Sequence, residues 1–253
     1  MLNIISLGAG KQSSFMLLEA LKGRFGIQPD MAIISDTGCE PKYVYDYLKW
    51  LTEYVKPFPI VIVSGGDLIK DTIDYIDGKS KRVAQLPLRL NSGGLVMRQC
   101  TMDYKIAPIR RHLQKVRNGE RIKLWIGISL DEMERQKESN VKYIEHYYPL
   151  VEHRIRIDEI VNYFNESGLK IPGKSACLIC PFHSDAYWKR FKKAFPIEFE
   201  DACKFDDKIR DYPKLREKTY LSKHRKPLRD IDFSYQDSLF PELIEECEGL
   251  CGL

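Results

Sequence analysis

The chain has 253 residues, 43% of them hydrophobic, which is enough to bury the core of one large α/β domain with or without a smaller C-terminal addition. Its formal net charge is +4, and basic residues are concentrated in WKRFKKAF (188–195) and KLREKTYLSKHRKPLR (214–229). These two segments are either solvated helix faces or a surface that contacts nucleic acid. No stretch approaches the roughly 20 apolar residues of a membrane helix and no signal peptide pattern opens the chain, so we expect a soluble, cytoplasmic protein without a membrane partner.

Four short apolar runs rich in β-branched residues predict strands that are covered on both faces. They are LNIISL (2–7), MAIIS (31–35), PIVIVS (59–64) and KLWIGIS (123–129). Three helical patterns alternate with them: SSFMLLEALKGRFG (13–26), PKYVYDYLKWLTEYV (41–55) and DYKIAPIRRHLQKV (103–116). This alternation with short connections predicts an α/β fold with a doubly wound parallel sheet. Ligands bind beyond the carboxyl ends of such strands, so we expect binding loops among 8–14, 36–41, 65–67 and 129–139.

After about residue 150 the strand signal fades and the chain becomes helical, polar and rich in cysteine. A short strand and a helix are predicted in 151–168, a loop in SACLICPFHS (175–184), and helices in DAYWKRFKKAF (185–195) and EFEDACKFDDKI (198–209). We therefore predict a nucleotide-binding domain over 1–150 and a helical C-terminal region with metal-binding cysteines over 151–253.

The loop SLGAGKQSS (6–14) follows the first predicted strand and opens a helix. Such a loop offers backbone N–H groups and the positive end of a helix dipole, which suits phosphate. It does not satisfy the Walker pattern, because no Ser or Thr follows Lys11, and Ser13 stands where the dinucleotide fingerprint has its third glycine. A glycine turn before a buried helix is the alternative interpretation.

Two further segments carry polar chemistry. In SDTGCEP (35–41), Asp36 and Thr37 can hydrogen-bond a nucleoside and Gly38 permits a tight turn, although a plain helix cap would have the same residues. The second segment, RQCTMDYKIAPIRRHL (98–113), contains four cationic side chains. They can neutralise a polyphosphate or a sulfate, or they can belong to an exposed basic helix. The four residues are Arg98, Lys105, Arg110 and Arg111.

The chain has seven cysteines, an odd number that does not indicate a disulfide framework. The Cys-x-x-Cys of Cys177 and Cys180 fits a zinc ion, an iron–sulfur cluster or a thioredoxin-like redox pair. Further ligands must then come from elsewhere in the chain, and buried structural cysteines are the alternative. The candidates for those ligands are Cys100, Cys203, Cys247, Cys251 and His183.

Taken in order, these segments resemble the phosphoadenosine phosphosulfate (PAPS) reductase-like family of the adenine nucleotide α-hydrolase-like superfamily, and within it a subgroup from bacteria and phages. The motifs that carry the resemblance are SLGAGKQSS, DTGCEP, RQCTMDYKIAPIRR, GISLDEMERQKES (127–139), CLICPFHSD and ECEGLCG. The resemblance implies a five-stranded parallel sheet with an adenine nucleotide at its carboxyl edge and chemistry at the α-phosphate. Members are either ATP pyrophosphatases that activate a substrate, often for sulfur transfer to nucleic acid, or sulfonucleotide reductases.

The chain departs from the family pattern at three places. Gln12 stands where an aspartate is usual, so an amide replaces a carboxylate that could help to hold Mg²⁺. A single cysteine, Cys100, precedes Thr101 where cluster-containing reductases have a Cys-Cys pair, and the tail has two cysteines and no histidine. These departures favour the sulfur-transfer members over an APS or PAPS reductase that releases sulfite. A non-catalytic nucleotide- and metal-binding module is the second alternative.

The resemblance also implies roles for individual residues. ATP or a related adenine nucleotide, APS and PAPS included, would be held by Ser6, Gly8, Ala9, Gly10, Lys11, Gln12, Ser13, Ser14, Asp36, Thr37, Gly38, Gly127 and Ser129. The catalytic set would be Lys11, Arg98, Lys105, Arg110, Arg111 and Cys247. Glu132 and Arg135 would close the site, or form a plain surface ion pair.

For the metal, we expect a 4Fe-4S cluster on Cys100, Cys177 and Cys180, completed by Cys251 or Cys247, with zinc as the runner-up. Cys39 and Cys203 are interpreted as structural or incidental. The expected partners are tRNA or DNA as acceptor, and a sulfur donor or thioredoxin-like reductant.

Overall fold

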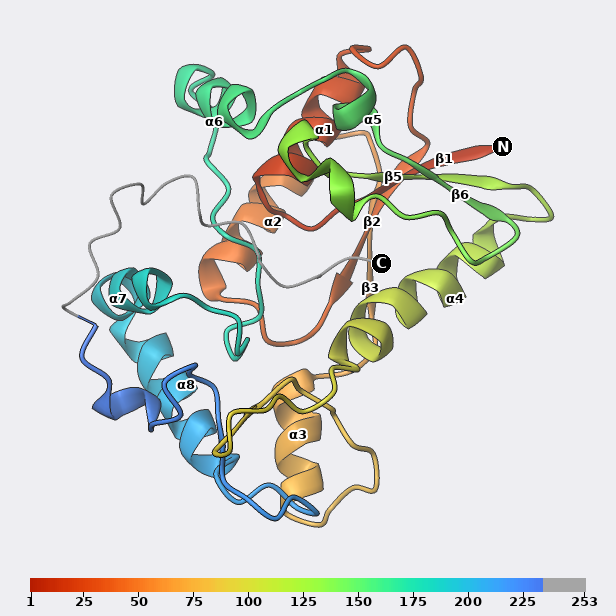
Figure 1. Ribbon diagram of the computed structural model, residues 1–253. Coiled ribbons are helices and arrows are strands. Elements are labelled where there is room, and N and C mark those ends of the chain that lie inside the picture. The colour runs from red at the N-terminus through yellow and green to blue at the C-terminus, as the bar shows by residue number, and fades with distance from the viewer. Residues whose placement is uncertain (234–253) are drawn as a thin grey trace. The chain divides into compact units, whose positions relative to one another are not determined.

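The computed structural model describes residues 1–233 of the chain (Figure 1). A five-stranded parallel sheet has the strand order β3-β2-β1-β5-β6, with Ile4 of β1 in register with Met31 of β2 and Leu124 of β5. The strands are β1 (Leu2–Ser6), β2 (Met31–Asp36), β3 (Ile60–Ser64), β5 (Ile122–Ile126) and β6 (Ile144–Tyr147). The α/β fold with a doubly wound parallel sheet is therefore confirmed.

Alternate residues of the central strands pack on opposite faces of this sheet, as the twofold side-chain period of a strand requires. On one face, Ile5 and Trp125 pack with residues of α1 (Lys11–Leu21), α2 (Lys42–Tyr54) and α6 (Ile157–Glu166). On the other face, Ile4 and Leu124 pack with Leu113 of α4 (Ala107–Val116). Burial on both faces explains why β1, β2 and β5 read as continuous apolar runs.

The edges of the sheet differ from the expectation. The prediction that all four strands are covered on both faces was wrong for β3, where Ile62 is 55% exposed. β6 was not predicted from the residues, because Glu145 and His146 interrupt its apolar pattern and only Ile144 is buried. An edge strand pairs on one side only, so it tolerates polar residues that a central strand excludes.

The predicted helices are present with shifted ends, and the structure also contains helices that were not predicted. A π-helix, η1 (Thr101–Ile106), precedes α4 and takes up the first part of the pattern predicted as one helix. α3 (Leu68–Ile76) was not predicted. The strand expected at the start of 151–168 was wrong, because α5 (Pro149–Glu152) and a turn occupy that place. The predicted loop 175–184 and the two late helices, α7 (Asp185–Ala194) and α8 (Pro196–Lys208), are confirmed.

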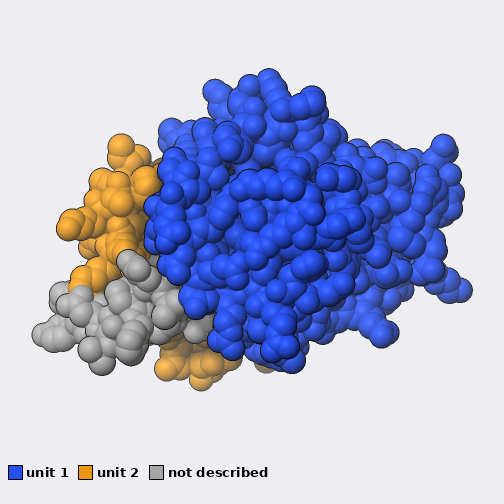
Figure 2. All heavy atoms as spheres, turned by 90° about the horizontal axis from the view of Figure 1, so that it is seen from above, with its two compact units in different colours: residues 1–36, 42–63, 106–175 blue, residues 37–41, 64–105, 176–253 orange. Residues whose placement is uncertain are grey.

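The chain divides into two compact units, and segments of the two units alternate along the sequence (Figure 2). Unit 1 comprises residues 1–36, 42–63 and 106–175 and contains the sheet. Unit 2 comprises 37–41, 64–105 and, within the described chain, 176–233. The predicted division at residue 150 does not coincide with either unit and stays a prediction.

Unit 2 is built from α3, α7 and α8 with little sheet. It also contains a two-stranded antiparallel ladder of β4 (Arg89–Leu90) and β7 (Thr219–Tyr220), the 3₁₀-helix η3 (Leu228–Asp230), and the π-helix η1 except for its last residue. Aromatic side chains of α7 and α8 form its core, with Trp188 in edge-to-face contact with Tyr187, Phe191 and Phe199. Within residues 1–233, no helix of either unit is long and apolar enough to cross a membrane.

Candidate nucleotide loop and cysteine pocket

The loop that follows β1 has the form of an open phosphate-binding turn. Ala9 adopts a left-handed conformation (φ 56°), which turns the chain sharply before α1 begins at Lys11. The Gly8 N–H donates to Ser13 Oγ at 3.0 Å, so the turn is closed by a residue of the helix it introduces. The N-cap residue is Gly10 and no side chain caps the helix. The first-turn N–H groups of α1 are therefore suited to receive an anion.

The carboxyl end of β5 packs directly on this first turn. A Cβ added to Gly127 would lie 2.9 Å from Ser13 Cα and 3.0 Å from Ser13 N, so only glycine allows this approach. Gln12 is buried, and its Nε2 donates to Ser129 Oγ at 3.2 Å and to Glu132 Oε2 at 2.8 Å. The structure thus brings Gln12, Ser13, Gly127 and Ser129 together, and their role in binding a nucleotide stays a prediction.

Glu132 lies in the 3₁₀-helix η2 (Leu130–Arg135) and is held from both sides, by the Gln12 amide and by an ion pair with Arg135. The alternative interpretation of Glu132 and Arg135 as a mere surface pair is incomplete, because Gln12 ties the pair to the phosphate-type turn. A carboxylate at position 12 would face Glu132 as a like charge. The Gln12 amide instead supplies a hydrogen-bond donor, so the contact between Gln12 and Glu132 forms without a metal ion between them.

Other predicted residues of unit 1 are dispersed over its elements. Ser14 is fully buried within α1. Asp36 at the end of β2 accepts a hydrogen bond from Tyr45 of α2 at 2.8 Å, a contact that the sequence did not indicate. Arg110 on α4 donates to Asn140 Oδ1 at 2.9 Å, and Arg111 is exposed. Arg98 and Lys105 belong to unit 2, so joint action of the four predicted cations stays a prediction.

The predicted nucleoside segment after Asp36 belongs to unit 2, where it packs on the start of α3. Gly38 has φ 70°, and a Cβ there would lie 2.9 Å from Asp67 Cα. Asp67 caps α3 by accepting from Lys70 N at 2.8 Å, and Leu68 N donates to Thr37 O at 2.8 Å. The glycine of the DTG motif is therefore needed for close packing on a helix N-terminus.

Unit 2 contains a pocket in which thiols and cations meet. Cys177, Cys180 and Cys100 line it from the CLIC turn and from the residue before η1. Arg98, Lys105 and Thr37 line the same pocket, together with the apolar side chains of Leu68, Leu86, Pro87, Ile179, Pro181 and Phe182. Lys105 Nζ lies 3.5 Å from Glu40 Oε1, and the Cys177 thiol donates to the same oxygen at 3.6 Å. Five residues predicted as catalytic or metal-binding thus share one cavity.

Cys39 was interpreted as structural or incidental, and the structure places its thiol beside Cys177. Thr37 Oγ1 lies 3.3 Å from Cys39 Sγ and 3.4 Å from Cys177 Sγ. Contact with the Cys177 thiol, together with burial, raises the pKa of Cys39. Cys203 is buried in α8, and burial raises the pKa of its thiol to about 11. Cys247 and Cys251 lie outside the described residues.

The donor set of this pocket fits a thiolate-ligated group in its chemistry. Among residues 1–233, no three His, Cys, Asp or Glu side chains are gathered closely enough to hold a single metal ion. A polynuclear cluster is instead surrounded by its cysteines, and three thiols line this cavity. His183, considered as a further ligand, has its Nε2 at 2.9 Å from the Cys177 carbonyl oxygen and its ring stacked on Tyr187. His183 thus supports the CLIC turn through the backbone.

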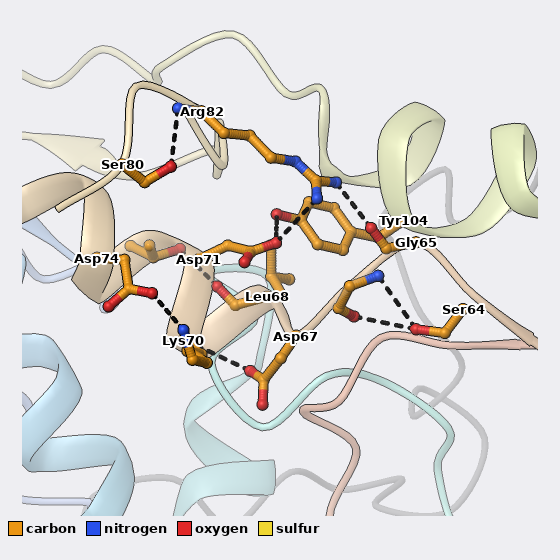
Figure 3. Close-up of polar contacts among 12 residues, drawn as sticks. Ser64, Gly65, Asp67, Leu68, Lys70, Asp71, Asp74, Ser80, Arg82 and Tyr104 are labelled. Atoms are coloured by element: carbon orange, nitrogen blue, oxygen red, sulfur yellow. Dashed lines mark hydrogen bonds and ion pairs between the residues drawn. The ribbon is translucent and has the colours of Figure 1, made fainter.

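A polar network that the sequence did not reveal fixes η1, the element that carries Lys105 (Figure 3). Tyr104 is fully buried and its hydroxyl donates to Asp71 Oδ2 of α3 at 2.7 Å. Arg82 pairs with the same carboxylate at 3.2 Å and lies over the Tyr104 ring, with 4.8 Å to the centroid. Burial, assisted by Asp71, raises the pKa of Tyr104 well above its ordinary value. The network joins α3 to the π-helix beside the pocket.

No protein-family model and no curated protein matches the chain. Among solved structures, the chain is similar to the U34-tRNA thiolase NcsA from Methanococcus maripaludis with its 4Fe-4S cluster. The similarity covers 80% of this chain and 69% of that chain, with 18% sequence identity and a TM-score of 0.42.

Proposed function

We propose that the chain is an adenine nucleotide-dependent enzyme that activates an acceptor at the α-phosphate of ATP and transfers sulfur to it. The observation that carries this proposal is the pocket of unit 2, where Cys100, Cys177 and Cys180 share a cavity with Arg98 and Lys105. Thiolates are the protein groups that carry or bind sulfur and soft metals, and cations attract a phosphate-bearing acceptor. Their coexistence supports sulfur chemistry on an anionic substrate such as tRNA or DNA.

The nucleotide part of the proposal is supported by unit 1. The uncapped N-terminus of α1 suits a phosphate, and Lys11 at the first helical position adds a positive charge. Gln12 and Glu132 hold the β5 loop against this turn, which keeps the geometry of the anion site fixed. In this proposal Lys11 and the first-turn N–H groups of unit 1 hold the phosphates and stabilise negative charge as pyrophosphate leaves.

Cys100, Cys177 and Cys180 are the residues that would hold a 4Fe-4S cluster, with zinc as the alternative. When bound, the cluster would supply an iron site for sulfide, and Mg²⁺ would accompany the nucleotide phosphates. The protein's own contribution is to place cations beside the thiols and to line the remaining wall with apolar side chains that exclude water.

The direct test is pyrophosphate release from ATP by anaerobically purified protein, with and without tRNA or DNA. We expect release to rise when the correct nucleic acid is present, and to fall at least tenfold in Lys105→Ala. Lys115→Ala removes the same charge from the exposed surface of α4 and is the matched control. No release with any acceptor would contradict the proposal, and ATP binding without release would leave the non-catalytic module.

One observation favours a second candidate, a sulfonucleotide reductase. The Cys39 and Cys177 thiols lie together, and paired thiols can supply the two electrons that release sulfite from APS or PAPS. The same preparation, given APS or PAPS and a thioredoxin-like reductant, separates the two reactions. Sulfite release without any pyrophosphate release from ATP would favour the reductase.

A further inference from the structure

Cys39 and Cys177 come from distant parts of the sequence and meet around one hydroxyl. Thr37 Oγ1 lies within 3.4 Å of both sulfur atoms. The backbone holds the two segments in place, because Leu178 N donates to Cys39 O at 2.7 Å. Thr37 is itself fixed by the bond from Leu68 N to its carbonyl oxygen.

We infer that Cys39 and Cys177 form a redox-active thiol pair, which a small disulfide of the glutathione type oxidises to a Cys39–Cys177 disulfide. This inference goes beyond the proposed sulfur transfer and does not depend on it. It concerns a covalent site within unit 2, where both residues lie.

The positions of the two thiols suit the order of a thiol–disulfide exchange. Cys177 lines the pocket and is partly exposed, so a small disulfide can reach it there. Cys39 is only 3% exposed, so it is reached through Cys177. The backbone bond between residues 39 and 178 keeps the two chain segments adjacent, and a disulfide requires such closeness.

The exchange proceeds in two steps that balance. The Cys177 sulfur attacks one sulfur of oxidised glutathione, which breaks the glutathione S–S bond, forms a mixed disulfide and releases one glutathione thiol. The Cys39 sulfur then attacks the Cys177 sulfur, forming the protein disulfide and releasing the second glutathione thiol. Two protein thiols are oxidised, one glutathione disulfide is reduced, and the two protein protons end on the released thiols.

Oxidation would change the pocket without unfolding the chain. It removes the Cys177 thiol from the set that can bind metal or carry sulfur, while Cys100 and Cys180 keep theirs. A dithiol reductant of the thioredoxin class would restore the set. The pair would therefore link the pocket's sulfur chemistry to the thiol–disulfide state of its surroundings.

The test uses the full chain, purified under reducing and anaerobic conditions, freed of reductant and exposed to oxidised glutathione. After acid quenching and alkylation with N-ethylmaleimide, the chain is digested with trypsin without reduction. Cys39 lies in the peptide 25–42, in which it is the only cysteine, and Cys177 lies with Cys180 in 175–189. We expect a linked pair of these two peptides, with fragmentation placing the bond at Cys177, and its loss after dithiothreitol.

Two other results would overturn the inference. A bond between Cys177 and Cys180 would lie within peptide 175–189 and would show that the Cys-x-x-Cys motif is the redox pair. A glutathione adduct that persists on Cys177 of the wild-type chain would show that Cys39 does not attack it.

Variants sharpen the result. In Cys39→Ser, the glutathione adduct on Cys177 should accumulate at least tenfold over wild type, because the thiol that resolves it in this inference is missing. Cys203→Ser is the matched control, since Cys203 is as buried as Cys39 and lies in the same unit, and it should keep the 25–42 to 175–189 link. Thermal unfolding shows whether each variant is folded, and if Cys39→Ser is not, the wild-type peptide map decides alone.

Discussion

Gln12 lies in the first turn of α1, and its contacts explain how this turn is stable without a carboxylate at position 12. The amide donates to Ser129 and to Glu132, whose carboxylate also pairs with Arg135. A second carboxylate here would lie against Glu132 in a partly buried site. Two carboxylates sharing a site cannot both ionise without cost.

We therefore predict that Gln12→Glu destabilises the protein at pH 8 by about 1–3 kcal/mol, as expected for a buried group that loses its partner. Acidification should restore part of that loss, because one carboxyl of the pair then takes a proton. Gln12→Ala removes the amide without adding charge, and its loss should be nearly independent of pH. Unfolding in urea at pH 5 and pH 8 measures both, and equal losses for Gln12→Glu at the two pH values would contradict the prediction.

The buried Cys203 thiol should make the free energy of unfolding fall as the pH rises above 9. Burial raises the pKa of its thiol from 9.0 to about 11 in the folded state, so folding favours the protonated form. This contribution is fully present below pH 9 and is lost as the pH rises from 9 to 11. With about 1.4 kcal/mol for each pKa unit, the contribution is about 2–3 kcal/mol.

Cys203→Ala should accordingly show a shallower fall in the free energy of unfolding between pH 9 and pH 11 than wild type. Denaturant unfolding at closely spaced pH values measures the slope. Identical slopes in wild type and Cys203→Ala would refute the prediction.

At the scale of elements, the central strands and the helices on them could be predicted from the sequence because burial on both faces demands unbroken apolar runs. The edge strand β6 could not, since its Glu145 and His146 are stable only where pairing is one-sided. The strand wrongly predicted at the start of 151–168 followed from isolated apolar residues. Ile155 is buried, but it lies after a turn and is not part of a paired strand. Local patterns do not distinguish these two routes to burial.

The loops of the candidate site could be predicted from the sequence, but the contacts between distant residues could not. The loops at strand ends could be found because glycine, small polar residues and a following helix occur together in the sequence. The contact of Gln12 with Glu132 and that of Cys39 with Cys177 could not, because each joins segments more than a hundred residues apart. Tyr104 and Asp71 are likewise ordinary in sequence, and only their meeting in unit 2 gives them a role.

The stability of α3 depends on Asp67, which both caps the helix and packs on Gly38. Replacing an N-cap aspartate with alanine costs about 1 kcal/mol. Asp67→Ala should lower the free energy of unfolding by that amount and speed hydrogen exchange at the Lys70 amide. Asp74→Ala is the matched control. It removes from the same helix a carboxylate that pairs with the exposed Lys70 side chain, and it should cost less than about 0.5 kcal/mol.

At the scale of the whole molecule, the two units are interleaved along the chain. The chain passes between them after residues 36, 41, 63, 105 and 175. The main core of unit 1 draws on Ile155, Ile160 and Phe164, which come late in its last segment. The stability of the sheet therefore depends on residues beyond the predicted division at residue 150.

Two fragments test this dependence, one ending at residue 150 and one at residue 175. Both contain the whole sheet, but only the longer keeps α6 over α1. We expect fragment 1–175 to melt cooperatively and at a higher temperature than 1–150, by circular dichroism at equal concentration. Equal melting of the two would show that residue 150 is a true folding boundary.

The interleaving also sets an order of events during synthesis. Every segment of unit 1 has left the ribosome once residue 175 has emerged, so its sheet can form while the rest is still being made. Thr37 to Pro41 emerge early yet belong to unit 2, and the bond between Cys39 and Leu178 has to wait for the CLIC turn. In the growing chain the Cys39 thiol is therefore uncovered for the time needed to translate about half of the protein, and it becomes protected only when Cys177 arrives beside it.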